Sequence, residues 1–265
     1  MAKEQINNSN YTEDNIKTLE WNEHIRRRAG MYVGRLGNGD DQGDGIYVLL
    51  KEVVDNSIDE FAMGFGKNIQ IKIEGKEVTV RDFGRGIPLG KLEQCVSDVN
   101  TGAKYNNNVF KQAIGMNGVG IKAVNALSTE MYVESVRDGM CKQVRFSGGV
   151  ILEESDIKPS DEPNGTLVRF TPDKDIFRDY AFREEFIIPL LKNYTFLNTG
   201  LSIFFNGKRF YSKNGLLDLL KENLTTDPLY DIIHLKGDDI EVVITHTKQY
   251  GEEYYSFVNG QHTTQ

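Results

Sequence analysis

The segment from Lys51 to Glu60, KEVVDNSIDE, places acidic and amide side chains where they could act together on one line of a helix. At 100° per residue, Glu52, Asn56 and Asp59 fall within about 60° of one another. Apolar side chains gather on the opposite side: Leu50, Val53, Val54, Ile58 and Phe61. A carboxylate can polarise a water molecule, and an amide oxygen can coordinate a metal cation that is also bound to a phosphate. Taken alone, however, the segment is better explained as a surface helix with solvated charges.

A second motif, DFGRGIP from Asp82 to Pro88, follows an expected strand directly. A carboxylate at a strand end can accept a hydrogen bond from an exocyclic amine such as adenine N6. The neighbouring glycines would let a flat ring approach the backbone. A single DxGxG pattern is common and usually marks only a turn, so this motif needs the others beside it.

Two further motifs lie downstream. The sequence GMNGVG, from Gly115 to Gly120, precedes an expected helix over 121–127, and backbone N–H groups at a helix start attract phosphates. No strand leads into it, so it differs from the dinucleotide-binding arrangement, and a structural turn is the simpler explanation of GxxGxG alone. Gly165 and Thr166 open another strand, where the Thr hydroxyl could complete a hydrogen-bond network around a carboxylate.

The elements that must position these motifs follow from periodicity and turn signals. Helices are expected over 19–28, 46–63, 89–99, 121–127, 182–196 and 216–223. Strands are expected over 69–73, 77–81, 130–137, 141–146, 150–154, 165–171, 201–205, 208–211, 240–247 and 254–259. Asp44 is expected to cap the motif helix, Asn206 and Gly207 to form a type I′ hairpin turn, and residues 29–45 to form a glycine-rich loop.

Composition narrows the class of protein. The chain has 265 residues, 39% of them hydrophobic and 26% charged, which suits one large or two small globular domains. Its net charge is −8 and no dense Lys/Arg run appears, which argues against a duplex-DNA surface within this segment. Cys95 and Cys141 lack metal-ligand spacing, so buried free thiols and a cytoplasmic location are expected. Neither a membrane span nor a signal peptide is predicted.

Three regions are expected along the chain. Residues 1–15 are polar and indicate an N-terminal arm, and residues 16–227 should form the main domain. After Pro228 the sequence pattern changes to that of short strands, so residues 228–265 should be the truncated start of a second domain.

Together, the order E-x3-N-x2-D, DxGxG, GxxGxG and GT resembles the GHKL ATPase superfamily, which includes type IIA topoisomerase ATPase subunits, Hsp90 chaperones, MutL repair proteins and histidine kinases. Within it, the chain is similar to the B subunits of bacterial gyrase and topoisomerase IV. The segments that carry this likeness run from about Tyr11 to the last residue: RRRAGMYVG, EVVDNSIDE, DFGRGIP, NTGAKY, GVGIKAVNALS, FLNTGLSI and SFVNGQHTTQ.

The resemblance implies an α/β two-layer sandwich of the Bergerat type, with a mixed, mainly antiparallel sheet and helices on one face. It implies ATP and Mg²⁺ as cofactors. Glu52 would be the general base, Asn56 the magnesium ligand and Asp82 the partner of the adenine amino group. Around them, the resemblance implies supporting residues: Gly86 and Thr166 bound through water, Asp59 in the same network, Arg85 beside the adenine and paired with Glu60, and Ile87, Pro88, Val54 and Met31 as apolar walls.

Residues 101–120 would form a lid over the nucleotide. Lys104 would contact phosphate, and the loop from Gly115 would cradle the phosphates through Asn117, Gly118, Val119 and Gly120. Tyr11 would reach across a dimer to the partner's nucleotide, with a disordered tail as an equal alternative.

In the family, ATP hydrolysis closes a protein clamp for DNA strand passage, and the enzymes are antibiotic targets. The partners implied are a second copy, a DNA-cleaving A subunit, and DNA through the whole enzyme rather than this fragment. The family's γ-phosphate lysine lies beyond residue 265, so we expect ATP binding, poor hydrolysis and a monomer from this chain alone. The alternatives are a chaperone-type or repair-type GHKL ATPase and a non-catalytic ATP sensor. The sequence does not decide between gyrase and topoisomerase IV, although its motif segments favour topoisomerase IV.

Overall fold

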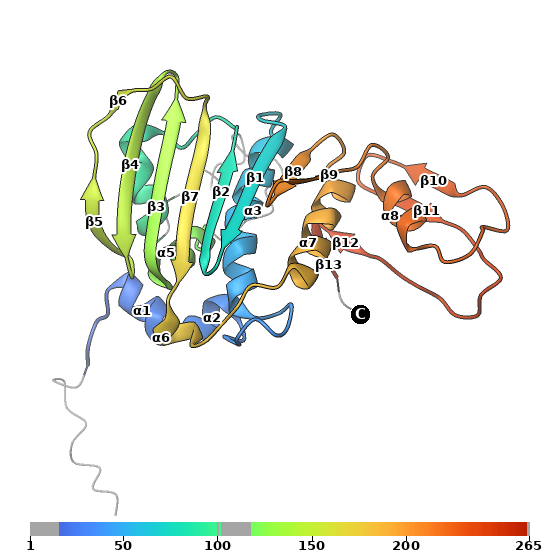
Figure 1. Cartoon of the computed structure of the whole chain (residues 1–265), viewed down its shortest axis with the longest axis horizontal. Helices are drawn as coiled ribbons and strands as arrows, with labels where there is room; N and C mark the ends of the chain where they lie inside the picture. Colours follow the sequence, from blue (N-terminus) through green and yellow to red (C-terminus); the bar gives the residue numbers. More distant parts are fainter. Residues whose placement is uncertain (1–15, 100, 102–117, 264–265) are drawn as a thin grey trace, which may run out of the picture.

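The computed structural model describes residues 16–99, 101 and 118–263, and in this part of the chain nine strands form one sheet (Figure 1). These strands are β1 (Asn68–Glu74), β2 (Glu77–Asp82), β3 (Ser128–Arg137), β4 (Met140–Ser147), β5 (Val150–Glu154), β6 (Lys158–Pro159), β7 (Gly165–Pro172), β8 (Ser202–Phe205) and β9 (Lys208–Tyr211). Their order is β5-β4-β3-β7-β2-β1-β8-β9, with β6 paired to β4. Among these strands only β1 and β8 run parallel, which confirms the expected mixed, mainly antiparallel sheet.

Helices cover one face of this sheet, as expected for a two-layer sandwich (Figure 1). The helices are α1 (Trp21–Arg27), α2 (Ala29–Val33), α3 (Gly45–Ala62), α4 (Leu92–Ser97), α5 (Gly120–Ala126), α6 (Lys174–Phe177), α7 (Glu184–Leu197) and α8 (Leu216–Asn223), with a 3-10 turn, η3 (Leu89–Lys91). The long helix α3 packs against β2, β7 and α5, so the core lies between α3 and the sheet.

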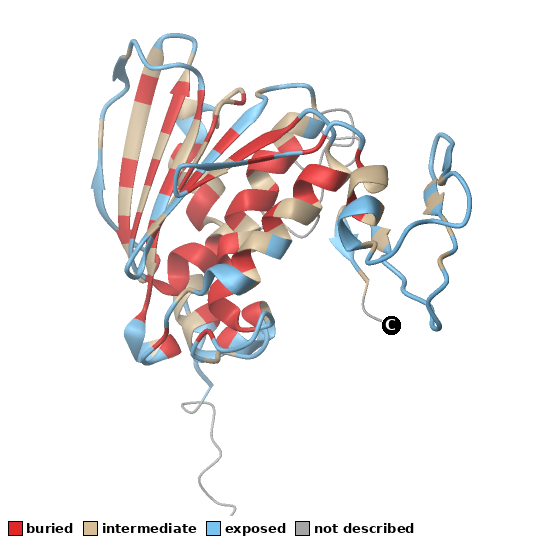
Figure 2. Ribbon diagram, turned by 45° about the vertical axis from the view of Figure 1, so that its right-hand side comes forward, coloured by how far each residue is buried: buried red, intermediate tan, exposed pale blue. Residues whose placement is uncertain are grey.

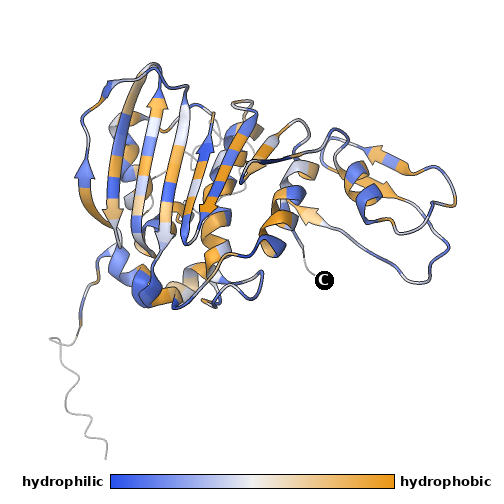
Figure 3. Ribbon diagram, viewed as in Figure 1, coloured by the Kyte–Doolittle hydropathy of each residue, from blue (hydrophilic) through white to orange (hydrophobic). Residues whose placement is uncertain are grey.

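Side-chain alternation explains why the strands bury one face. In β2, Val78 and Val80 are buried, and Asp82 continues the same buried face at the end of the strand. Figure 3 shows hydrophobic and hydrophilic residues alternating along the strands of the sheet. The alternation therefore directs a carboxylate toward the helical layer.

On α3, the predicted division of faces holds for the apolar side. The residues Leu50, Val53, Val54 and Ile58 are no more than 2% exposed, and Phe61 is partly buried. Figure 2 shows this burial along the helix beneath the sheet. The helix begins after Asp44 as predicted, but the Asp44 side chain does not cap it. Its carboxylate instead accepts bonds from Arg35 (2.7 Å) and from the Gly39 N–H (2.9 Å), which fold the preceding loop.

Several boundaries differ from the sequence-based expectation. Residues 29–33 are not loop but a helical turn, α2, because Ala29 and Val33 are buried against the core. The helix expected over 89–99 is divided between η3 and α4. The sequence does not predict the short elements α6, β6 and β10, and the strands expected over 240–247 and 254–259 are shorter.

The C-terminal part forms two separate ribbons outside the main sheet. One pairs β10 (Ile233–Lys236) with β11 (Glu241–Ile244), and the other pairs β12 (Phe257–Val258) with β13 (Gln261–His262). The boundary near residue 228 stays a prediction. Among the described residues, no helix is long and apolar enough to cross a membrane. Both cysteines are free thiols, with Cys141 buried and Cys95 half-buried.

A buried polar contact fixes α3 against α7. Tyr194 donates a hydrogen bond to Asp55 Oδ1, and Lys51 Nζ lies 2.6 Å from Asp55 Oδ2. Asp55 and Tyr194 are each 2% exposed, and burial raises the pKa of Asp55. The carboxylate therefore depends on these two partners to be tolerated in the core.

Substituting Tyr194→Phe is expected to lower the free energy of unfolding by about 2 kcal/mol, because it withdraws one donor from a buried carboxylate. Urea denaturation at pH 7 measures this change. Tyr211→Phe is the matched control, since Tyr211 is 47% exposed on β9. Equal stability of Tyr194→Phe and the control would show that the contact does not support the fold.

Candidate functional site

The polar face of α3 meets the beginning of α5. Glu52 and Asn56 are half-buried on α3, and the Asn56 amide nitrogen donates to the Glu52 carbonyl at 2.9 Å. That bond orients the Asn56 amide and uses its nitrogen as a donor. The amide oxygen is then the atom that can act as a metal ligand. A Cβ added to Gly120 would lie only 1.7 Å from Glu52 Oε2, so the carboxylate rests directly on the first residue of α5. Any side chain at that position would displace the carboxylate.

The buried side chain of Lys122 fastens the backbone at this same place. Lys122 is 2% exposed, and its ammonium group donates to the carbonyls of Thr101 (2.6 Å) and Gly118 (2.7 Å). Those two residues lie on either side of residues 102–117 in the sequence. The side chain therefore ties two separate chain segments to α5 beside Glu52.

The end of β2 supplies the second carboxylate. Asp82 is 7% exposed, and its Oδ1 accepts hydrogen bonds from the N–H groups of Gly84 (2.9 Å) and Thr166 (3.2 Å). Oδ2 is then the oxygen that can meet an external amino group. Gly165 has a φ of 141°, and a Cβ there would lie 2.2 Å from the Asp82 carbonyl, so glycine allows β7 to approach. The structure thus joins the DxGxG and GT motifs around one carboxylate.

Burial raises the pKa of Asp82 to about 6, although the two N–H donors oppose this shift. Since an unfolded Asp titrates near 3.9, the folded state keeps a proton that the unfolded state has lost between about pH 4 and 6. Folding stability contributed by the protonated form is therefore present below about pH 4 and lost as the pH rises through about 6.

Substituting Asp82→Asn should remove this pH dependence, because the amide stays neutral and can still accept both N–H bonds. We expect the variant and the original chain to be equally stable near pH 4, and the variant to be about 2–3 kcal/mol more stable at pH 7. Urea denaturation at both pH values measures the difference. A constant difference between the two proteins from pH 4 to pH 7 would contradict a raised pKa.

The loop after Asp82 is held by the ion pair that the family resemblance implies. Arg85 Nε and Nη2 lie 3.0 and 2.9 Å from the two Glu60 oxygens, and the Arg85 N–H donates to the same carboxylate. Gly86 has a φ of 75°, and a Cβ there would lie 2.4 Å from the Val136 carbonyl. Ser135 Oγ donates to the Ile87 carbonyl at 2.7 Å. The loop is therefore fixed to α3 and to β3.

The structure brings together most of the described residues expected in the site, and separates two. Asp59 is buried on α3, Ile87 is half-buried, and Pro88 is exposed at the loop's end. Val54 is fully buried in the core, so it backs the site rather than forming a wall, and Met31 lines a different cavity near α2. Tyr11, Lys104, Gly115 and Asn117 lie outside the described residues.

Two residues that help to hold the site in place are not predicted from the sequence. Asp55 falls in a segment where solvated charges are the simplest expectation, but it is buried and pairs with Tyr194, which is 139 residues away. Lys122 lies in an Ala/Val-rich helix, where a buried lysine is unusual, and that mismatch is the available signal.

The assembled site can polarise a water molecule at Glu52, coordinate a cation at Asn56, and accept a hydrogen bond from a ring amine at Asp82. Among the described residues, no cluster of three or more His, Cys, Asp or Glu side chains could hold a metal by itself. Any cation here would therefore need ligands from a bound phosphate and water, as Mg²⁺ commonly has.

Known proteins resemble this chain over most of its length. Residues 41–176 match the family model described as "Histidine kinase-, DNA gyrase B-, and HSP90-like ATPase". The chain is 52% identical over 255 residues to the B subunit of DNA topoisomerase 4 from Borreliella burgdorferi. It is 32% identical over 277 residues to the B subunit of DNA gyrase from Streptococcus pyogenes. The alignments cover 96% of this chain and 42% of each relative, so the chain spans less than half of their length.

A solved structure agrees with the fold. The crystal structure of the 43K ATPase domain of Thermus thermophilus gyrase B, in complex with an aminocoumarin, matches with a TM-score of 0.70 and 28% identity. The match covers 86% of this chain and 62% of that chain.

Proposed function

We propose a function for this chain from the family to which it belongs, the histidine kinase-, DNA gyrase B- and HSP90-like ATPases. The chain binds ATP and supplies the hydrolytic site of a bacterial type IIA topoisomerase. The observation that carries the proposal is the joint placement of three groups. Glu52 and Asn56 lie on one face of α3 against the start of α5, and Asp82 lies buried at the end of the neighbouring strand β2. Phosphate would thus be recognised beside the middle of α3, and adenine beside the loop that Glu60 holds near the end of the same helix.

Each residue has a role that follows from its chemistry. Asp82 Oδ2 accepts the adenine amino group, and Gly86 and Thr166 complete this pocket through water. Asp59 supports the same network, and Arg85, Ile87 and Pro88 border the ring. Glu52 polarises the attacking water, and the N–H groups from Gly118 to Gly120 face the phosphates at the start of α5. Asn56 would hold Mg²⁺ through its amide oxygen, and the ion, when bound, neutralises phosphate charge.

The residues outside the described part keep their expected roles within the proposal. Lys104 and the loop with Gly115 and Asn117 would contact phosphate, and Tyr11 would reach a partner's nucleotide. Residues 16–227 would form the ATPase domain, and residues 228–265 would begin a second domain.

The whole protein would act with other chains. A second copy would form an ATP-dependent clamp, a DNA-cleaving A subunit would complete the enzyme, and strand passage would take place on DNA in the bacterial cytoplasm. The relative that shares 52% of its aligned residues is a topoisomerase 4 protein, and its higher identity favours that assignment over gyrase.

Two measurements test the proposal separately. Isothermal titration of the 265-residue chain with a non-hydrolysable ATP analogue and Mg²⁺ should give one site per chain. The full-length protein with its partner should then decatenate or supercoil DNA only when ATP is present. No nucleotide binding would refute the site, whereas nucleotide binding without DNA activity would leave an ATPase of another type.

A further inference from the structure

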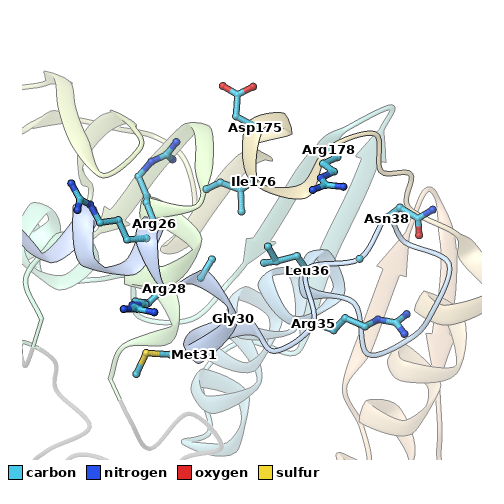
Figure 4. A pocket seen from close by; sticks show the side chains of 13 residues that line it. Arg26, Arg28, Gly30, Met31, Arg35, Leu36, Asn38, Asp175, Ile176 and Arg178 are labelled. Atoms are coloured by element: carbon cyan, nitrogen blue, oxygen red, sulfur yellow. The ribbon is translucent and has the colours of Figure 1, made fainter. Parts of the chain in front are cut away.

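Five arginines from two distant parts of the chain line one cavity of about 990 Å³ where α1, α2 and α6 meet (Figure 4). Arg26, Arg27 and Arg28 lie at the end of α1, Arg35 follows α2, and Arg178 follows α6. We call this the arginine cavity. Arg26, Arg27 and Arg28 are consecutive in the sequence, whereas Arg178 is brought to them only by the fold.

Three of these arginines are fixed by carboxylates that lie outside the cavity lining. The pairs are Arg26 with Asp173 (2.6 Å), Arg27 with Glu23 (2.5 Å) and Arg35 with Asp44 (2.7 Å). A guanidinium carries five N–H donors, so an ion pair on one side still permits donation to a ligand on the other. These arginines are therefore positioned, although their charge is largely balanced.

Two arginines supply charge that the described part of the chain does not balance. Arg28 and Arg178 are exposed and form no ion pair among residues 16–99, 101 and 118–263. The acidic residue in the lining is Asp175, whose side chain points outward in Figure 4. A chain of net charge −8 thus places two unbalanced cations beside three fixed ones.

Arg178 also has a backbone conformation that disfavours any side chain. Its φ of 57° and ψ of −135° are nearly those of Gly34 (66°, −133°) and Gly215 (61°, −126°). At those two places the chain uses glycine, which adopts such angles without steric cost. A residue other than glycine lowers stability there, and retained strain of this kind is often found at functional positions.

We propose that the arginine cavity binds adjacent phosphate groups, and that Arg28 and Arg178 contact them most directly. Guanidinium forks match phosphate oxygens in shape and charge. The cavity is also large enough for a small multivalent anion. The phosphates could belong to a free polyphosphate or to a nucleic-acid backbone, since both present the same groups. The proposal does not depend on the function assigned to Glu52 and Asp82.

Titration of the 265-residue chain with sodium tripolyphosphate, and separately with a DNA duplex of about 20 base pairs (roughly two helical turns), tests both sources. Replacing both Arg28 and Arg178 by Gln should weaken tripolyphosphate binding at least about tenfold. The matched control replaces Arg145 and Arg169 by Gln; they lie on β4 and β7, and their side chains are 43% and 44% exposed. It should bind as the original chain does.

Duplex binding that is lost in the same double variant would identify the nucleic-acid backbone as the source. Tripolyphosphate binding without duplex binding would identify a free polyphosphate. The proposal is overturned if neither probe binds, or if the cavity variant and the control bind equally.

Arg178→Gly separates a binding role from a structural one. Because glycine relieves the strained backbone, the melting temperature should rise by about 2–4 °C. Tripolyphosphate affinity should nevertheless fall, since a contacting cation is removed. Unchanged affinity in this more stable variant would contradict a ligand contact at Arg178.

Discussion

Replacing Glu52 by Gln is expected to reduce ATP turnover by a factor of about 10²–10⁴ while changing nucleotide affinity by less than about threefold. Glutamine has the same shape and still fits against Gly120, where the Glu52 carboxylate now rests. It cannot take a proton from the attacking water. Steady-state phosphate release by the full-length protein measures turnover, and titration with a non-hydrolysable analogue measures affinity.

The position of Glu52 makes this separation sharp. The carboxylate lies at the start of α5, on the phosphate side of the proposed site. Glu77→Gln is a suitable control, because Glu77 is an exposed carboxylate at the start of β2. Turnover by Glu52→Gln at the rate of that control would remove Glu52 from the role of base. A parallel loss of affinity would instead indicate that Glu52 contributes to binding.

The parts of the site that the sequence could predict are those governed by local periodicity. A period of about 3.6 residues puts Glu52, Asn56 and Asp59 together on α3, and a period of about 2 puts Asp82 on the buried face of β2. Burial of the apolar partners on each element then fixes which way these polar groups point. The residues of the proposed site are thus specified by the same patterns that build the core.

The remaining parts depend on contacts between distant residues, for which one sequence contains no signal. Asp55 meets Tyr194 across 139 positions, and Arg178 joins the α1 arginines only through the packing of α6. The helical turn α2 is not predicted because Gly30 and Gly34 suggest a loop, whereas the burial of Ala29 and Val33 stabilises it. In each case, tertiary packing determines a structure that local sequence preference does not predict.

Asp82→Asn is expected to weaken binding of an ATP analogue by a factor of about 100 or more, because a charge-assisted bond is lost and a repulsive contact is introduced. The N–H groups of Gly84 and Thr166 both point at Oδ1, so the asparagine oxygen must stay there. Its amide nitrogen then occupies the place of Oδ2. A donor would face the adenine amino group, which is also a donor.

The same reversal predicts a change in base preference. Guanine carries a carbonyl oxygen where adenine carries the amino group, so the amide of the Asp82→Asn variant should tolerate a guanine analogue better than the Asp82 carboxylate does. Titration of both proteins with ATP and GTP analogues measures the preference. Since the variant is expected to be more stable at pH 7, lost affinity cannot be attributed to unfolding. Equal preference for the two bases in both proteins would show that Asp82 does not contact the ring, even though its buried carboxylate is otherwise costly to the fold.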